Sequence, residues 1–145
     1  MLIQRVNRTD PEKVFIVVKN TYSTAAITVG QAVVFDYTTD ADGVGVTRPT
    51  TALLKLPAGI VETASIANGD YGLVQVYGHN ANALVSGSSG TIAGIALVMQ
   101  NNSFELLRLS TAIDTFGQAC TFAFVAGQAY STGTAAAKKV FVRAL

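Results

Sequence analysis

The chain has 145 residues and a mass of 15.1 kDa, which is the size of a single domain. Half of its residues (50%) are hydrophobic and only 13% are charged, which excludes intrinsic disorder and a coiled coil. The formal net charge of +1 excludes strong electrostatic attraction to nucleic acid. So few charges indicate either a tightly closed barrel or a surface that other chains partly cover.

Cys120 is the only cysteine, so the fold does not depend on an intramolecular disulfide or an oxidising compartment. Residues 1–13 lack the apolar stretch of a signal peptide. The longest apolar runs, Val14–Val18 and Ile92–Met99, are far shorter than the ~20 residues that cross a bilayer. We therefore expect synthesis in the cytoplasm and no membrane partner.

The chain begins with a polar segment that contains Arg5 and Arg8 and passes through Pro11. We predict that residues 1–13 form an extended N-terminal arm and that residues 14–145 form a single β-barrel-like domain. The first run of the domain, Val14–Val18, is apolar and rich in β-branched residues, which predicts a strand covered on both faces.

Further short β-type runs follow, most of them with alternating side-chain character. The main expected strands are Gln31–Tyr37, Tyr71–Gly78, Cys120–Ala126 and Val140–Leu145. Weaker candidates are Gly59–Ala64, Ala83–Ser86, Ile95–Gln100 and Phe104–Leu109. Turn sequences rich in Asp, Asn, Ser and Gly separate these runs. These turn sequences are Asp40–Gly43, Asn68–Asp70, Gly87–Gly90 and Ser131–Thr134.

No segment keeps a helical apolar period over three turns, although Ala135–Lys139 is compatible with one helical turn. Many short strands at a spacing of roughly 8–12 residues are typical of all-β sandwiches and barrels. We predict an all-β fold: a small antiparallel β-barrel or β-sandwich with an extended N-terminal arm.

Residues that could support catalysis are few. His79 is the only histidine and Cys120 the only cysteine, which excludes a multi-histidine metal site and a structural zinc site. The two residues could pair as nucleophile and base. However, Cys120 lies beside Phe122 in an apolar run, where a cysteine behaves as a small buried hydrophobe. His79 follows Gly78 and is expected in a hairpin loop. We therefore expect no catalytic residue and no enzyme activity, and keep a small Cys/His hydrolase as an alternative.

The run Asp40–Gly43 is similar to part of a calcium-binding loop. Aligning its glycine with the invariant glycine of that loop places Thr38 first and Pro49 last, where acidic ligands are needed. A turn is the better interpretation. No glycine-rich phosphate loop occurs either. The sequence therefore predicts no metal and no cofactor.

A small basic group near the C-terminus, Lys138, Lys139 and Arg143, lacks the interleaved aromatic residues of a nucleic-acid site. A carbohydrate or metabolite binder would need exposed aromatic platforms. The candidate platforms are Tyr71, Tyr77 and Tyr130. We expect each of them to pack in the wall of the barrel instead.

Several glycine-bounded motifs occur in an order that resembles the small capsid decoration, or cement, proteins of tailed bacteriophages. The resemblance covers the chain from about residue 25 to the end. It is most specific at Gly69–Gly78, with Gly127–Leu145 in support, and residues 1–23 do not share it. The motifs are Thr28–Val34, Pro57–Val61, Ile66–Gly78, Ala93–Leu97, Val125–Tyr130 and Lys139–Leu145.

In that family such barrels sit on the outer surface of the capsid, often as trimers, and tie major capsid subunits together. The resemblance therefore implies a virion structural protein on the outer capsid surface. Its implied partners are the major capsid protein and further copies of this chain, with a trimer expected. The alternative within the same class is a tail- or fibre-associated β module that contacts a host surface.

The arm has too few apolar residues to fold alone, and such a segment becomes ordered on a partner surface. We expect it to contact a neighbouring subunit or the capsid, with Leu2 and Ile3 as anchors beside Val6. Arg5 and Arg8 are expected to reach acidic groups of that partner.

Overall fold

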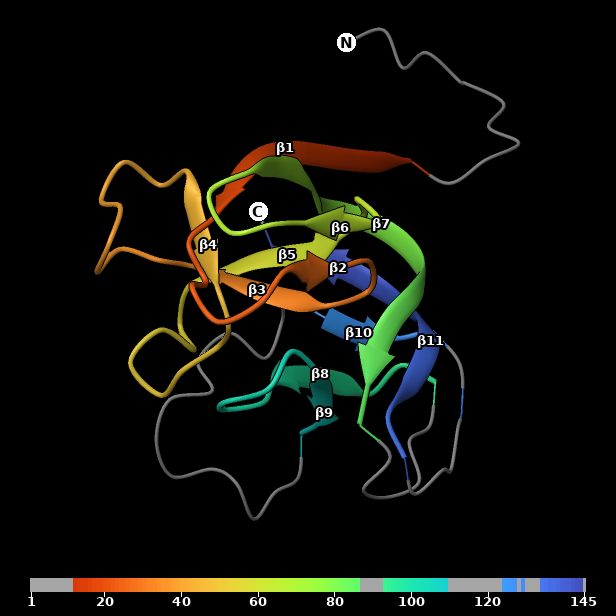
Figure 1. The fold of residues 1–145 in the computed structure, drawn as a ribbon. Coiled ribbons are helices and arrows are strands. Elements are labelled where there is room, and N and C mark those ends of the chain that lie inside the picture. The colour runs from red at the N-terminus through yellow and green to blue at the C-terminus, as the bar shows by residue number, and fades with distance from the viewer. Residues whose placement is uncertain (1–11, 87–92, 110–123, 128, 130–133, 145) are drawn as a thin grey trace, which may run out of the picture.

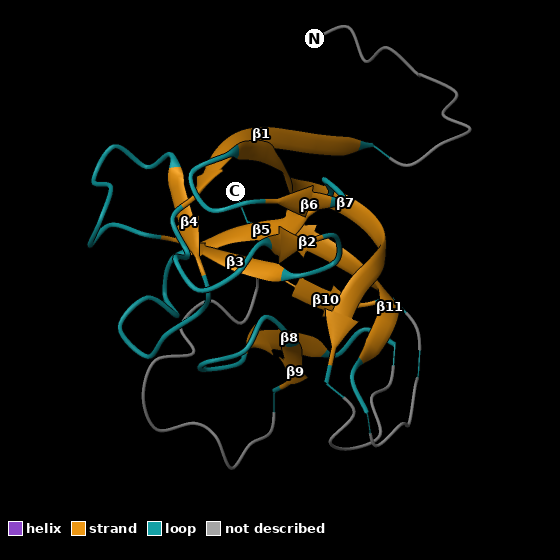
Figure 2. Cartoon of the chain, viewed as in Figure 1, coloured by secondary structure: helices purple, strands orange, loops and turns teal. Residues whose placement is uncertain are grey.

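The computed structural model describes residues 12–86, 93–109, 124–127, 129 and 134–144 (Figure 1). Within these ranges every regular element is a strand (Figure 2), and no helix there is long and apolar enough to cross a membrane. The predicted all-β fold is confirmed. The strands are β1 (Lys13–Asn20), β2 (Ile27–Thr28), β3 (Ala32–Phe35), β4 (Gly45–Thr47), β5 (Pro57–Val61), β6 (Ser65–Ile66), β7 (Tyr71–Val85), β8 (Ala96–Met99), β9 (Leu106–Arg108), β10 (Phe124–Ala126) and β11 (Ala136–Arg143).

The strand pairings close into two rings that share β7. One ring runs through β1, β4, β3, β5 and β7 and returns to β1. The other runs from β7 through β11, β10, β8 and β9 and returns to β7, where Val85 pairs with Leu106. The β1–β4 and β7–β9 pairs are parallel and the others antiparallel, so the main sheet is mixed. A separate antiparallel pair, β2–β6, covers part of the first ring.

Two clusters of buried apolar side chains fill the molecule, as expected when alternate residues of a strand face opposite sides. Strand β3 contributes Val33 to one cluster and Val34 to the other, and β5 likewise contributes Val61 and Ile60. These two strands therefore form a wall between the clusters. The cluster of the first ring also contains Val18, Ile27, Val46, Ala58, Ile66, Val74 and Val76. The other cluster includes Ala83, Val85, Leu97, Met99, Leu106, Phe124, Ala126, Val140 and Val142.

Strand β7 is longer than the sequence pattern suggested. The expected break after Gly78, with His79 in a hairpin loop, is wrong, because Tyr71–Val85 is one continuous strand. At Gly78 the strand bends: its φ is +101°, and the backbone of Glu12 packs where a side chain would stand. A glycine at such a position allows two backbones to approach closely without ending the strand.

Two further expectations need correction. The segment Ala135–Lys139 is not a helical turn, because Ala136 begins β11 and pairs with Val85 of β7. The run Val14–Val18 does lie in β1, but in the single chain it is covered on one face only. Residues 120–123 of the expected strand Cys120–Ala126 lie outside the described residues.

Candidate interaction surface

The outer side of β1 and β7 carries large apolar side chains that nothing in the described chain covers. Val17 and Tyr71 are each 62% exposed, more than any other large hydrophobic residue of the described ranges. We call the set of exposed side chains on these two strands the β1–β7 face. Its members are Val14, Phe15, Val17, Tyr71, Leu73 and Tyr77.

The register of the two strands brings these side chains together. Strands β1 and β7 pair antiparallel, with Val17 opposite Leu73. The register shifts between Val14 and Phe15, so that Val14 pairs with Tyr77 and Phe15 with the residue two positions earlier in β7. The extra residue of this β-bulge lies in β7, between the partners of Val14 and Phe15. Val14 is 37% exposed and lies opposite Tyr77, another exposed residue of the face.

The size of the face indicates a binding role. With typical side-chain areas, its six members expose on the order of 500 Å² of mostly apolar surface, near the upper end for the largest patch of a monomer. The patch extends toward β11, because the rings of Tyr77 and Phe141 meet edge to face with centroids 5.4 Å apart. Apolar patches near this limit are often functional sites.

The same face ends at a free strand edge. Among the described residues, β1 pairs with β7 over Lys13–Lys19, and β4 joins its other edge only at Lys19 and Asn20. Between Lys13 and Val18 that other edge has no partner strand in the described ranges. An unpaired edge presents backbone N–H and C=O groups that a further strand can join.

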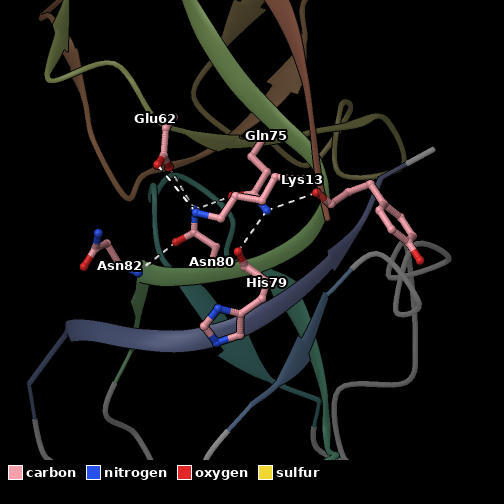
Figure 3. A network of polar contacts seen from close by, with 7 residues as sticks. Lys13, Glu62, Gln75, His79, Asn80 and Asn82 are labelled. Carbon is pink, nitrogen blue, oxygen red and sulfur yellow. Dashed lines mark hydrogen bonds and ion pairs between the residues drawn. The ribbon is translucent and has the colours of Figure 1, made fainter. Parts of the chain in front are cut away.

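A buried polar network holds the bend of β7 that positions this face (Figure 3). The side chain of Gln75 is fully buried, and its Nε2 donates to the carbonyl oxygens of Tyr77 (3.0 Å) and His79 (3.2 Å). Asn80 Nδ2 donates to Gln75 Oε1 at 2.9 Å. These bonds satisfy backbone groups around the bend, so the polar side chains can be buried without a large penalty.

The network continues to β1 through Glu62, which follows β5. Asn80 Nδ2 donates to Glu62 Oε2 at 3.2 Å, and the Lys13 ammonium lies 4.0 Å from the other carboxylate oxygen (Figure 3). Asn80 Oδ1 in turn accepts from the backbone N–H of Asn82 at 2.8 Å. Side chains of Lys13 and Glu62 are about one third exposed, so their ion pair contributes little energy by itself. The network fixes where β1 starts on β7.

At its other end the face meets an acidic hollow. Lys19 and Tyr71 border it together with the loop between β3 and β4. The hollow has a volume of about 370 Å³ and is lined by Lys19, Thr21, Thr39, Asp40, Asp42, Val44 and Tyr71. Two carboxylates against one ammonium give it an excess of negative charge.

Asp36 anchors the loop that carries these carboxylates. Its carboxylate accepts hydrogen bonds from Thr21 Oγ1 (2.7 Å), Thr38 Oγ1 (2.6 Å) and the Thr39 N–H (3.2 Å). Burial by itself would raise the pKa of Asp36, but the hydrogen bonds from Thr38, Thr21 and Thr39 outweigh it and hold the pKa below its usual value. The loop is therefore fastened to the segment that follows β1.

The structure describes only some of the residues that the sequence suggested as contact or binding residues. The predicted contact residues of the arm, and also Cys120 and Tyr130, lie outside the described residues, so those predictions stand as they were. The arm residues are Leu2, Ile3, Arg5, Val6 and Arg8. His79 is half-buried within β7. The expected wall packing of Tyr71 and Tyr77 is wrong, since both belong to the exposed face.

The run Asp40–Gly43 forms a turn, in which the Asp42 N–H donates to Asp40 Oδ1 at 3.1 Å. The described ranges contain no group of three or more His, Cys, Asp or Glu residues that could hold a metal ion. The sequence pattern alone does not single out Phe15, Val17 and Leu73 as a site. The available signal was the apolar run of β1, which is equally consistent with internal burial and with a partner.

Two rings of strands joined through one long strand, with an apolar outer face, define a small all-β module suited to assembly. The chain is similar in fold to the crystal structure of the N base of the head fiber protein gp8.5 of bacteriophage phi29, with a TM-score of 0.52. The similarity covers 92% of this chain and 96% of that chain at 12% sequence identity, so it establishes the fold. No family model matches the chain, and no curated protein matches its sequence.

Proposed function

We propose that this chain is a structural protein of a bacteriophage virion, which binds the outer surface of the capsid and reinforces the head by tying major capsid subunits together. The observation that carries the proposal is the fold, shared over nearly the whole chain with the base of a phage head fiber. The exposed β1–β7 face supports it, because a virion protein of this size must contact other subunits.

The mechanism is multivalent binding by an oligomer, for which we propose a trimer. Each copy adds a modest interface with the capsid, and its linked neighbours raise the effective concentration of the next contact. If the chain binds only the assembled shell, it stabilises that state by mass action. No catalytic step is part of this function. Cys120→Ala should therefore leave head binding intact, whereas a thiol hydrolase would lose its activity.

The test is the composition and structure of purified particles of the virus that encodes the chain. We expect mass spectrometry to detect the chain, and a density map to place it in many copies on the outside of the shell. Particles that contain none of it would refute the proposal.

The similarity to a fiber base favours one second candidate, a module that anchors a projecting fibre on the virion. Copy number and placement separate the two roles. A reinforcing protein occupies equivalent sites over the whole shell, whereas a fibre or tail component occurs at a restricted set of positions. Density of the chain at the base of projecting fibres, at a restricted set of positions, would select the second candidate.

A further inference from the structure

The proposed function leaves open what covers the β1–β7 face and its free strand edge. We infer that residues 1–11 of a second copy of this chain lie on this face as an added strand along β1. In this arrangement the apolar residues of the arm cover Phe15 and Val17 of β1, and its arginines reach the acidic hollow. The inference rests on the proposed assembly of several copies and specifies the contact between them.

The chemistry of the site fits an extended peptide. The free edge of β1 offers backbone groups between Lys13 and Val18, and the exposed side chains of Phe15 and Val17 on β1 stand beside that edge. Strand addition uses both features, because the backbone bonds supply affinity and the adjacent side chains supply specificity. A partner that covered the apolar side chains alone would leave the backbone edge unused.

The length of chain before the described residues fits the site. Eleven residues precede Glu12, and an extended segment of that length spans up to ~36 Å. Strand β1 has eight residues and extends over ~27 Å. An arm of this length can therefore cover β1 from end to end. The backbone of Glu12 still packs against Gly78, so docking of the arm on its own face would need a chain reversal within about two residues.

Charge complementarity selects the direction of the added strand. Arg8 lies in the second half of the arm and Arg5 near its middle, and the acidic hollow with Asp40 and Asp42 lies at the Lys19 end of β1. A strand parallel to β1 brings its second half to this hollow and places Leu2 and Ile3 near Phe15. An antiparallel strand would instead bring Arg8 toward Lys13. Opposite charges across an interface fix register and direction in this way.

This contact is heterologous, because the arm of one copy meets the face of another. Heterologous contacts generate closed rings when the rotation between copies closes, and a trimer is one such ring. The arm and the face are therefore two halves of one interface, and each copy contributes both.

The test measures the oligomeric state of the free protein by light scattering during size-exclusion chromatography at fixed concentration. Val17→Asp places a charge in the centre of the face and should yield monomers. The matched control is Val29→Asp, since Val29 is 45% exposed in the turn before β3 and belongs to neither strand of the face. The control should elute as the wild type does. Circular dichroism establishes that each variant is folded.

Charge reversal gives a second test that does not alter the face. Arg5→Asp with Arg8→Asp, and separately Asp40→Lys with Asp42→Lys, should each shift the protein to monomers. All four substitutions in one chain should restore the oligomer, because the two charge sets are complementary again. This series of variants tests the contact between the arm and the hollow even if Val17→Asp fails to fold.

Several results would overturn the inference. They are a monomeric wild-type protein, an unchanged oligomer for both charge reversals, or an oligomer that survives deletion of residues 1–11. If the arm variants lose binding to heads but keep the oligomer, the arm contacts the capsid instead. These measurements use free protein, so a failure of the inference is distinct from absence of the chain from virions.

Discussion

Replacing Gly78 by alanine should break the start of the β1–β7 pairing. Gly78 has a φ of +101°, where an L side chain is strained, and an added Cβ would collide with the carbonyl oxygen of Glu12. Backbone atoms cannot rotate away as the end of a flexible side chain can. The beginning of β1 must therefore move away from β7, with the loss of the pairs at Lys13 and Val14.

The expected loss of unfolding free energy in Gly78→Ala has two parts, the strain of a positive φ and the collision with Glu12. Gly69 provides the matched control, because its φ is +86° and no atom lies within 4 Å of a Cβ built there. Gly69→Ala should therefore cost only the strain of a positive φ, about 1 kcal/mol of unfolding free energy. Gly78→Ala should cost that strain plus the displaced strand, about 3–5 kcal/mol in total.

Urea unfolding followed by circular dichroism measures both variants against the wild type. The expected result is a much lower midpoint for Gly78→Ala than for Gly69→Ala. Equal midpoints for the two variants would refute the reasoning, because they would show that the close approach of Glu12 to β7 does not contribute to the unfolding free energy.

Asp36→Asn should lower the unfolding free energy by about 1–3 kcal/mol near neutral pH, through loss of charged hydrogen bonds. Folding lowers the pKa of Asp36, so the stabilisation by its carboxylate is lost as the pH falls below 3.8. Urea titrations should therefore give similar unfolding free energies for the variant and the wild type at low pH. An equal difference in unfolding free energy at pH 7 and pH 2 would contradict this. Gln75→Leu should cost about 2–4 kcal/mol in the same assay, since it removes the hydrogen bond from Asn80 and the donor to the Tyr77 and His79 carbonyl groups; a neutral effect would show that water replaces the amide. Phe124→Ala should cost about 3–5 kcal/mol by calorimetry, because Phe124 is fully buried in the core of the second ring; a loss below about 1 kcal/mol would contradict that packing.

Local patterns in the sequence were enough to find most of the longer strands. The runs Val14–Val18 and Tyr71–Gly78 lie in β1 and β7, and the turn expected at Asn68–Asp70 is present. Strands β2, β4 and β6 have two or three residues each, too few for any periodicity. Their existence depends on pairing with distant segments, which a single sequence does not reveal.

The continuity of β7 could not be inferred for a related reason. Asn80 and Gly78 are typical turn residues, and their proximity in the sequence predicts a hairpin loop. In the structure the amide of Asn80 is satisfied by Gln75 and Glu62, and that tertiary arrangement allows it inside a strand. The β1–β7 face could not be predicted either. Only the strand register, which places Val17 opposite Leu73, shows that these exposed side chains form one surface.

The shared strand β7 has a consequence for how the molecule unfolds. Both rings need β7 to close, and residues of β7 contribute to both buried clusters. Neither half can open while the other keeps an intact wall, so the two cores should melt in a single cooperative transition. Amide hydrogens in the middle of β7 should then exchange only through global unfolding, at the slowest rates in the chain. If the chain binds a capsid as proposed, it would resist local opening along the whole of that strand.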